Sequence, residues 1–200
     1  MGLTNHDLVT DTWWWNSASP IAIMDGLYTI ATIDAASFVY VGDPQVNFDF
    51  TVTAGAAVVE ITVSSALLSF TTINSASGAA SASLELVDAG GGGASLFGLG
   101  PGGAAYLAQY NGFVPGGTAF ANLLTTPLSG PSSATESFPV SGFAAIGVPV
   151  FDMSAQFHFS LSANDQAIGS SSFEIIPAPG ALGLLAIGLI GSRRRRRLTD

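Results

Sequence analysis

The sequence contains no cysteine and no lysine, and its five arginines form a single run at positions 193–197. Without cysteine the chain has no disulfide, no thiolate metal ligand and no cysteine nucleophile. Upstream of the arginines only two histidines carry basic side chains. Because Lys and Arg contacts to phosphates dominate nucleic-acid affinity, we expect no nucleic-acid binding by this region.

The remaining composition is that of a weakly charged β protein. Charged residues make up 10% of the chain, against about 25% in an average soluble domain, and the formal net charge is −9. A surface rich in small and hydroxyl-bearing residues and poor in charge is common in extracellular β domains. The chain of 200 residues is long enough for one domain with its own hydrophobic core.

Two runs of alternating apolar and polar residues predict half-buried β-strands. Apolar residues occupy the odd positions of 151–162, from Phe151 to Leu161, and the even positions of 46–53, from Val46 to Val52. Since successive side chains of a strand point to opposite faces, each run buries one row of apolar residues.

Further short strands are predicted between clusters of Gly, Pro, Asn and Ser, at 28–33, 37–41, 57–64, 67–73, 81–87, 104–110, 118–123, 136–140 and 166–176. A change of apolar parity near Ser65 and Ala66 predicts a bulge or corner. Long loops are expected at the glycine-rich segment 90–103 and at 125–135. Together these patterns predict an all-β fold with a single antiparallel β-sandwich or jelly roll.

Three regions are expected along the chain. Residues 1–20 form an N-terminal segment with no evident signal peptide, because they contain acidic residues and three tryptophans but no Lys or Arg. The β-sandwich is expected at 21–175. A tail at 176–197 consists of an extended linker and one short C-terminal transmembrane helix at 181–192.

The tail combines three features. The linker contains Pro177, Ala178, Pro179 and Gly180, and the ten apolar residues 181–190 follow it. The run of arginines comes next: Arg193, Arg194, Arg195, Arg196 and Arg197. A ten-residue helix is only roughly 15 Å long, which is short for a bilayer core of about 30 Å. The arginines are expected to hold this weak span on the cytoplasmic side.

This layout resembles the PEP-CTERM sorting signals of exported bacterial proteins, over about residues 176–197. The resemblance implies that an exosortase-type membrane enzyme recognises Pro177, Ala178, Pro179 and Gly180 and processes the chain near them. Ala178 stands where the family motif has glutamate, so the particular processing enzyme stays open. The resemblance implies transient membrane anchoring, followed by release to the cell surface or the extracellular space. A permanent, unprocessed anchor with the same topology is the alternative.

Candidate binding residues are few. Trp13 and Trp15 share one face of an expected strand and could stack on a carbohydrate, or one ring could pack into the domain edge. Asp43 and Asp49 belong to the densest group of oxygen ligands and are candidates for a structural calcium ion, as an alternative to solvated, turn-forming aspartates. No other cofactor is expected.

No catalytic residues are predicted. A G-x-G-x-x-G pattern at 98–103 is not followed by the acidic residue that a dinucleotide fold needs, so we interpret it as a loop. His158 lies on the polar row of its strand, where a solvated or cross-strand hydrogen-bonded histidine is expected. We therefore predict a non-enzymatic, exported structural or adhesive protein of the cell surface or an exopolysaccharide matrix. The alternatives are a carbohydrate-binding module and an unprocessed, anchored surface protein.

Overall fold

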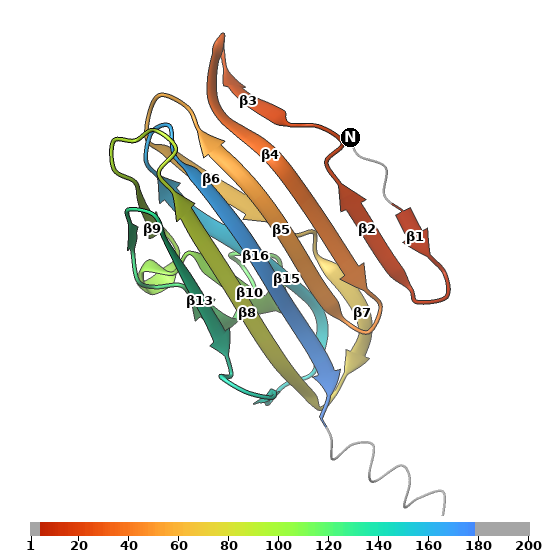
Figure 1. Cartoon of the computed structure of the whole chain (residues 1–200). Coiled ribbons are helices and arrows are strands. Elements are labelled where there is room, and N and C mark those ends of the chain that lie inside the picture. The colour runs from red at the N-terminus through yellow and green to blue at the C-terminus, as the bar shows by residue number, and fades with distance from the viewer. Residues whose placement is uncertain (1–4, 179–200) are drawn as a thin grey trace, which may run out of the picture.

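Two antiparallel β-sheets pack face to face in the computed structural model, which describes residues 5–178 (Figure 1). The first sheet has nine strands and the second has seven. This arrangement confirms the predicted all-β sandwich. The predicted transmembrane helix at 181–192 lies outside the described residues.

In the first sheet, neighbouring strands follow the order β1 (Asn5–Asp7), β2 (Thr12–Asn16), β4 (Tyr28–Val41), β5 (Gln45–Ala54), β16 (Gln166–Pro177), β8 (Ala76–Val87) and β13 (Ser132–Phe138). Two short strands lie outside this order: β3 (Ile21–Asp25) pairs with β4, and β14 (Ala144–Ile146) pairs with β8.

In the second sheet the order is β11 (Thr118–Leu123), β10 (Tyr106–Tyr110), β15 (Val150–Leu161), β9 (Ser95–Gly98) and β12 (Leu128–Ser129). Two further strands, β6 (Val59–Ser64) and β7 (Leu68–Ile73), also pair with β15. A short 3-10 helix, η1 (Pro101–Gly103), follows β9.

Strand β15 organises the second sheet because other strands pair along both of its edges. Phe157 pairs with Tyr106 of β10 and with Val63 of β6, so β10 and β6 lie on opposite sides of β15. Met153 likewise pairs with β10 and with Leu68 of β7. Strands β6 and β7 therefore form one edge of the second sheet.

The core lies between the two sheets, where the predicted apolar rows of β5 and β15 meet. The Phe157 ring is fully buried at its centre, with ring centroids at 5.5 Å from Phe48, 5.1 Å from Phe50 and 4.9 Å from Tyr106. Burying a large apolar side chain contributes roughly 1.5–3 kcal/mol, so this aromatic cluster is a major source of stability. It joins both sheets without any disulfide.

Phe151 departs from the alternation predicted for β15. Its side chain is exposed, whereas the neighbouring Val150 and Asp152 are buried. The pairing of β15 with β7 is irregular beside Phe151, because the two-residue step from Val150 to Asp152 stands opposite a four-residue step of β7 from Ile73 to Ser69. The buried Asp152 carboxylate accepts a hydrogen bond from the backbone N–H of Gly112 at 2.7 Å.

The first sheet begins before residue 21, where the predicted sandwich starts. Strand β2 contains the three tryptophans and pairs with β4, so that Trp15 lies opposite Phe38. Aromatic residues favour the pleated, half-buried surface of a sheet, which explains why this run forms a strand. The predicted strands 28–33 and 37–41 are one strand, β4, with a register shift between Ile33 and Ala35.

The glycine-rich segment 90–103 is more regular than the long loop that its composition predicts. It contains β9 and η1. A Cβ atom at Gly98 would overlap the backbone of Ala104 and Ala105, so glycine allows two chain segments to touch at this point. The second predicted loop, 125–135, similarly contains β12 and the start of β13.

The corner predicted near Ser65 and Ala66 is confirmed. Strand β6 ends at Ser64 and β7 begins at Leu68, and both pair with β15. The Ser65 hydroxyl accepts a hydrogen bond from the Ala155 backbone N–H at 2.9 Å, which fixes the corner against the central strand.

Candidate functional site: an apolar groove beside β6

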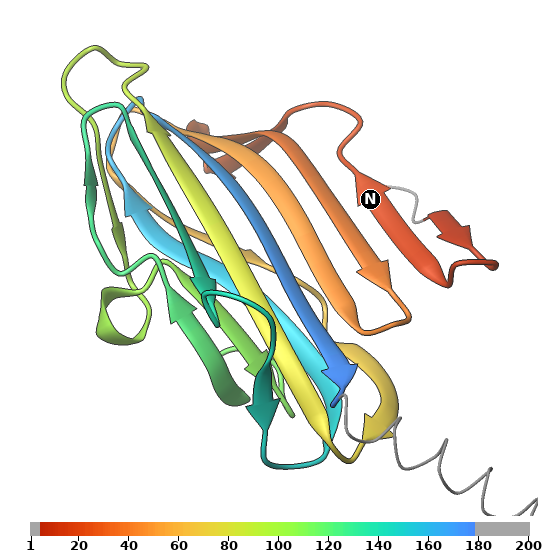
Figure 2. The same cartoon turned by 60° about the horizontal axis from the view of Figure 1, so that its bottom comes forward.

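The first sheet extends beyond the cover of the second sheet, and the uncovered part forms an apolar groove. Burial shows the difference: alternate residues of β5 are buried, whereas all five residues of β3 are exposed. Figures 1 and 2 show β1 to β4 on the side of β5 away from β16. The groove between this overhang and β6 has a volume of about 500 Å³.

Strands β2 to β6 all contribute to the groove. Its lining comprises Trp15 of β2, Ile21 and Ile23 of β3, Ile30, Ala31, Ile33, Ala36 and Phe38 of β4, Phe50 and Val52 of β5, and residues 59–64 of β6. We refer to this set as the apolar groove.

The floor of the groove is the hairpin of β3 and β4. Ile21 pairs with Ile33, and Ile23 pairs with Ala31, so apolar side chains meet across the two strands. Ile21, Ile23 and Ile30 are exposed although they are large and apolar. Contiguous exposed apolar surface of this kind marks an interaction site more often than scattered single residues do.

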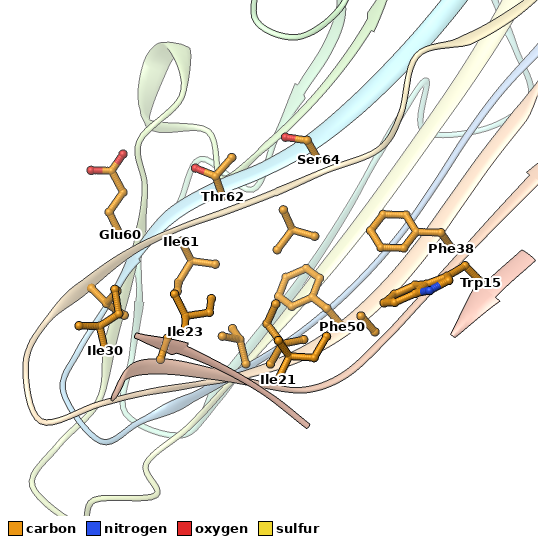
Figure 3. Close-up of a pocket in the computed structure, with 16 residues that line it drawn as sticks. Trp15, Ile21, Ile23, Ile30, Phe38, Phe50, Glu60, Ile61, Thr62 and Ser64 are labelled. Carbon is orange, nitrogen blue, oxygen red and sulfur yellow. The ribbon is translucent and has the colours of Figure 1, made fainter. Parts of the chain in front are cut away.

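The wall of the groove is β6, whose side chains alternate between two environments. Figure 3 shows Ile61 directed into the groove and Glu60, Thr62 and Ser64 directed away from it. On that outer face Glu60 Oε1 lies 2.6 Å from Nε2 of His158. This contact confirms the cross-strand hydrogen bond expected for His158. The only carboxylate of the groove lining therefore points away from the apolar surface.

An aromatic group closes one end of the groove. The Trp15 ring lies 5.9 Å from the Phe38 ring, and Phe38 stacks on Phe48 with a centroid distance of 5.3 Å. Trp15 is half-buried. The group connects the exposed groove to the aromatic core, so a ligand that reaches Trp15 would touch residues packed against the centre of the sandwich (Figure 3).

The two tryptophans predicted as carbohydrate contacts have different surroundings. Trp15 lines the groove, but Trp13 stacks against His6 with a centroid distance of 3.9 Å and an interplanar angle of 5°. His6 in turn lies 3.1 Å from the Asp11 carboxylate. One face of the Trp13 ring is therefore covered, and the pair forms no open platform of two rings.

The predicted calcium ligands are on different parts of the β4–β5 hairpin. Asp43 lies in the turn and lines a second groove together with Pro44 and Pro177. Asp49 lies within β5 and accepts a hydrogen bond from the Ser37 hydroxyl at 3.2 Å. Within residues 5–178, no three side chains of His, Asp or Glu come together as metal ligands. Calcium binding stays a prediction.

Half of the predicted sorting motif is described. Pro177 is the last residue of β16 and pairs with Ala76 of β8. The backbone N–H of Ala178 donates a hydrogen bond to the Ser75 carbonyl at 2.7 Å. Pro179, Gly180 and the five arginines at 193–197 lie outside the described residues. In the part of the chain that is described, no helix has the length and apolar content needed to cross a bilayer.

Sequence reasoning missed the isoleucines that form the floor of the groove. Ile21 and Ile23 alternate with Ala22 and Met24, which is a strand pattern, but the run is short and every residue in it is apolar. Such a run does not reveal which face is buried. The pairing of β3 with β4 supplies that information.

Comparisons with known proteins give no family. No family model matches the chain, and no curated protein matches it. Two solved structures of infectious bursal disease virus show a remote likeness. The Gt strain structure is 14% identical with a TM-score of 0.28, and the match covers 84% of this chain and 47% of the viral chain. For the Gx strain the identity is 14%, the TM-score 0.25 and the coverage 86% and 50%. The chain thus spans about half the length of these viral chains.

Proposed function

We propose that the protein is an exported, non-catalytic structural or adhesive component of the cell surface or of an exopolysaccharide matrix. Its C-terminal tail acts as a sorting signal that an exosortase-type enzyme processes. Transient insertion of the helix at 181–192, with Arg193 to Arg197 on the cytoplasmic side, holds the protein at the membrane before processing. The proposal rests on the sequence of the tail and on the apolar groove.

One observation carries the adhesive part of the proposal: the groove presents a large apolar surface to solvent. Ile21, Ile23 and Ile30 are exposed, and the only carboxylate of the lining, that of Glu60, points to the other face. Burying apolar area against a partner is favourable in proportion to the area removed from water. The groove thus suits contact with another apolar surface.

Carbohydrate binding is the second candidate, and Trp15 is the residue that favours it. A half-buried indole beside a groove can stack against a sugar ring. Sugar recognition also needs convergent polar groups, but Thr62 and Ser64 point away from the groove (Figure 3). The apolar lining therefore favours the first candidate.

Intact-mass analysis tests the sorting function. The chain is expressed behind an export signal in a host with exosortase processing, and protein is recovered from cells and medium. We expect a mature product that lacks residues 193–197. A variant with all five arginines replaced by serine should lose membrane retention, whereas Glu60→Gln, a matched change within the domain, should be processed normally. An intact mass that includes the arginines supports an unprocessed anchor, and full-length protein in the cytosol contradicts export.

Variants of the groove test the adhesive function. Ile23→Ser combined with Ile30→Ser should reduce retention of the mature protein in the matrix several-fold. Leu27→Ser, in the exposed turn between β3 and β4, is the control and should leave retention unchanged. Binding to a purified glycan that is lost in Trp15→Ala but kept in the double serine variant would favour the carbohydrate-binding candidate.

A further inference from the structure

One end of the sandwich is the place where the chain leaves the folded domain. Strand β16 ends there at Pro177, beside the start of β8. The strand pairings place further turns at the same end, among them β1–β2 (8–11), β4–β5 (42–44), β10–β11 (111–117), β13–β14 (139–143) and β14–β15 (147–149). Figures 1 and 2 show the β4–β5 turn near the end of β16 and the β1–β2 turn farther from it, at the edge of the first sheet. We call this region the exit end.

The exit end exposes large apolar side chains at the tips of its turns. Leu8 and Val9 in the β1–β2 turn are 84% and 94% exposed. Val140 is 94% exposed in the loop between β13 and β14, and the residues that flank this loop, Phe138 and Ala144, pair with Ala80 and Gly78 near the start of β8. Phe113 and Val148 are exposed in two other turns of the same end. Separate turns thus present apolar tips around the point where the chain leaves.

Exposure alone does not distinguish this end, because Leu27 and Val58 are exposed at the opposite end. The distinguishing feature is the sequence that follows the exit. Ala178 is still hydrogen-bonded to Ser75, and the apolar run begins three residues later at Ala181. Three extended residues span at most about 11 Å. If the run enters a bilayer, as the proposed function requires, the point where the chain leaves the domain, at Ala178, is held within that distance of the lipid.

Charge indicates which lipids this end can approach. The acidic residues of the exit end include Asp7, Asp11 and Asp43, and residues 5–178 contain no Lys or Arg. Anionic headgroups attract basic segments and repel acidic ones. They therefore repel this domain, which has acidic residues but no Lys or Arg within residues 5–178. Uncharged or zwitterionic headgroups impose no such repulsion, and apolar side chains can bury themselves at the boundary between headgroups and acyl chains.

We propose that the exit end docks on a zwitterionic lipid surface through Leu8, Val9 and Val140 while the tail is inserted. The tail supplies a high effective concentration, so weak contacts by a few apolar tips suffice to orient the domain. The β3–β4 hairpin and the apolar groove then project away from the bilayer. The inference rests on the proposed membrane insertion of the tail.

Single-site labelling of the full chain tests this orientation, and the absence of native cysteine makes the labelling specific. A polarity-sensitive fluorophore is attached in Val140→Cys and, as the control at the opposite end, in Leu27→Cys. Each protein is mixed with phosphatidylcholine vesicles that contain a lipid-borne quencher. We expect at least threefold stronger quenching at position 140 than at position 27. Flotation of the protein with the vesicles reports insertion of the tail independently.

Two further changes sharpen the test. Leu8→Asp with Val9→Asp should reduce quenching at position 140 at least twofold without changing flotation. Leu27→Asp should change neither the quenching at position 140 nor the flotation. Replacing half of the lipid with phosphatidylglycerol should also reduce quenching at position 140. Near-UV circular dichroism checks that each variant keeps its tertiary packing.

The outcomes separate the two proposals. Flotation with equal quenching at both positions overturns the docking of the exit end and leaves the proposed sorting function intact. Stronger quenching with anionic lipid overturns the choice of a zwitterionic surface. A full chain that does not float overturns the membrane insertion of the tail and, with it, the docking.

Discussion

Two regions of the first sheet both present apolar side chains but differ in what covers them. On β5 and β16, residues such as Phe48 and Phe173 are fully buried beneath the second sheet. On β3 and the first part of β4, Ile23 and Ile30 also lie on an apolar face, yet they are exposed. We call these regions the closed half and the overhang.

The comparison shows that alternation specifies an apolar face but not its partner. In the closed half, that partner is the second sheet, and burial contributes to folding. In the overhang, the second sheet ends at β6, and the apolar surface is available for contacts outside the domain (Figure 3). Apolar strands therefore stabilise the fold in the closed half and provide a surface for interaction in the overhang.

The largest expected effect is a difference in the free energy of unfolding between a substitution in the closed half and one in the overhang. Phe157→Ala should lower the free energy of unfolding by about 3–5 kcal/mol, because it leaves a cavity among three aromatic rings. Ile23→Ala in the overhang should cost less than about 1 kcal/mol, because the side chain is already exposed. Urea denaturation of both variants measures the difference. Equal losses would mean that the overhang is covered in solution.

Alkaline pH should also act on the closed half. Complete burial raises the pKa of Tyr106 well above its ordinary value of about 10. Above pH 10 the unfolded chain therefore releases a proton that the folded chain retains, and stability falls by about 1.4 kcal/mol per pH unit for this group. Thermal unfolding at pH 10, 11 and 12 measures the decline.

Two phenylalanine variants identify the residue responsible. Tyr106→Phe should reduce the alkaline decline, whereas Tyr28→Phe, at an exposed position of the overhang, should leave it unchanged. Identical pH profiles for Tyr106→Phe and the parent chain would assign the decline to other groups.

Most of the sandwich could be predicted from the sequence because its central strands alternate over long stretches. The rows of β5 and β15 identify the core directly, and the parity change near Ser65 locates a corner. Alternation wrongly predicts that Phe151 is buried, and it does not encode the irregular pairing of β7 beside this residue. The order of strands in each sheet depends in the same way on long-range pairing.

The candidate groove could not be predicted, for a related reason. Its floor and wall come from strands distant in sequence, and Ile23 and Ile61 approach the same space only after both sheets have formed. The glycine-rich segment illustrates the opposite error. Its composition indicates flexibility, but Gly98 is required by the close approach of Ala104. Composition does not distinguish these two uses of glycine.

An intermediate effect is expected within that segment. Gly98→Ala should destabilise the fold by about 1–3 kcal/mol, because the added methyl group would overlap the backbone of Ala104 and Ala105. Gly92→Ala is the matched control, since no atom lies within 4 Å of a Cβ at that position, and it should change stability by less than about 0.5 kcal/mol. Equal midpoints of urea unfolding for the two variants would mean that segment 90–103 behaves as a flexible loop, as its composition predicts.

The smallest expected effect separates the two faces of β6. Glu60→Gln alters a contact with His158 on the outer face, and both side chains are partly exposed, so the cost should be below about 1 kcal/mol. Ile61→Ala, one residue further along, removes a buried side chain at the boundary of the closed half and should cost about 2–5 kcal/mol. Denaturant titration of the two variants measures the loss of unfolding free energy for each. If Glu60→Gln were as costly as Ile61→Ala, the outer face of β6 would contribute as much to folding as the face that lines the groove. The boundary between the closed half and the overhang would then not lie at β6.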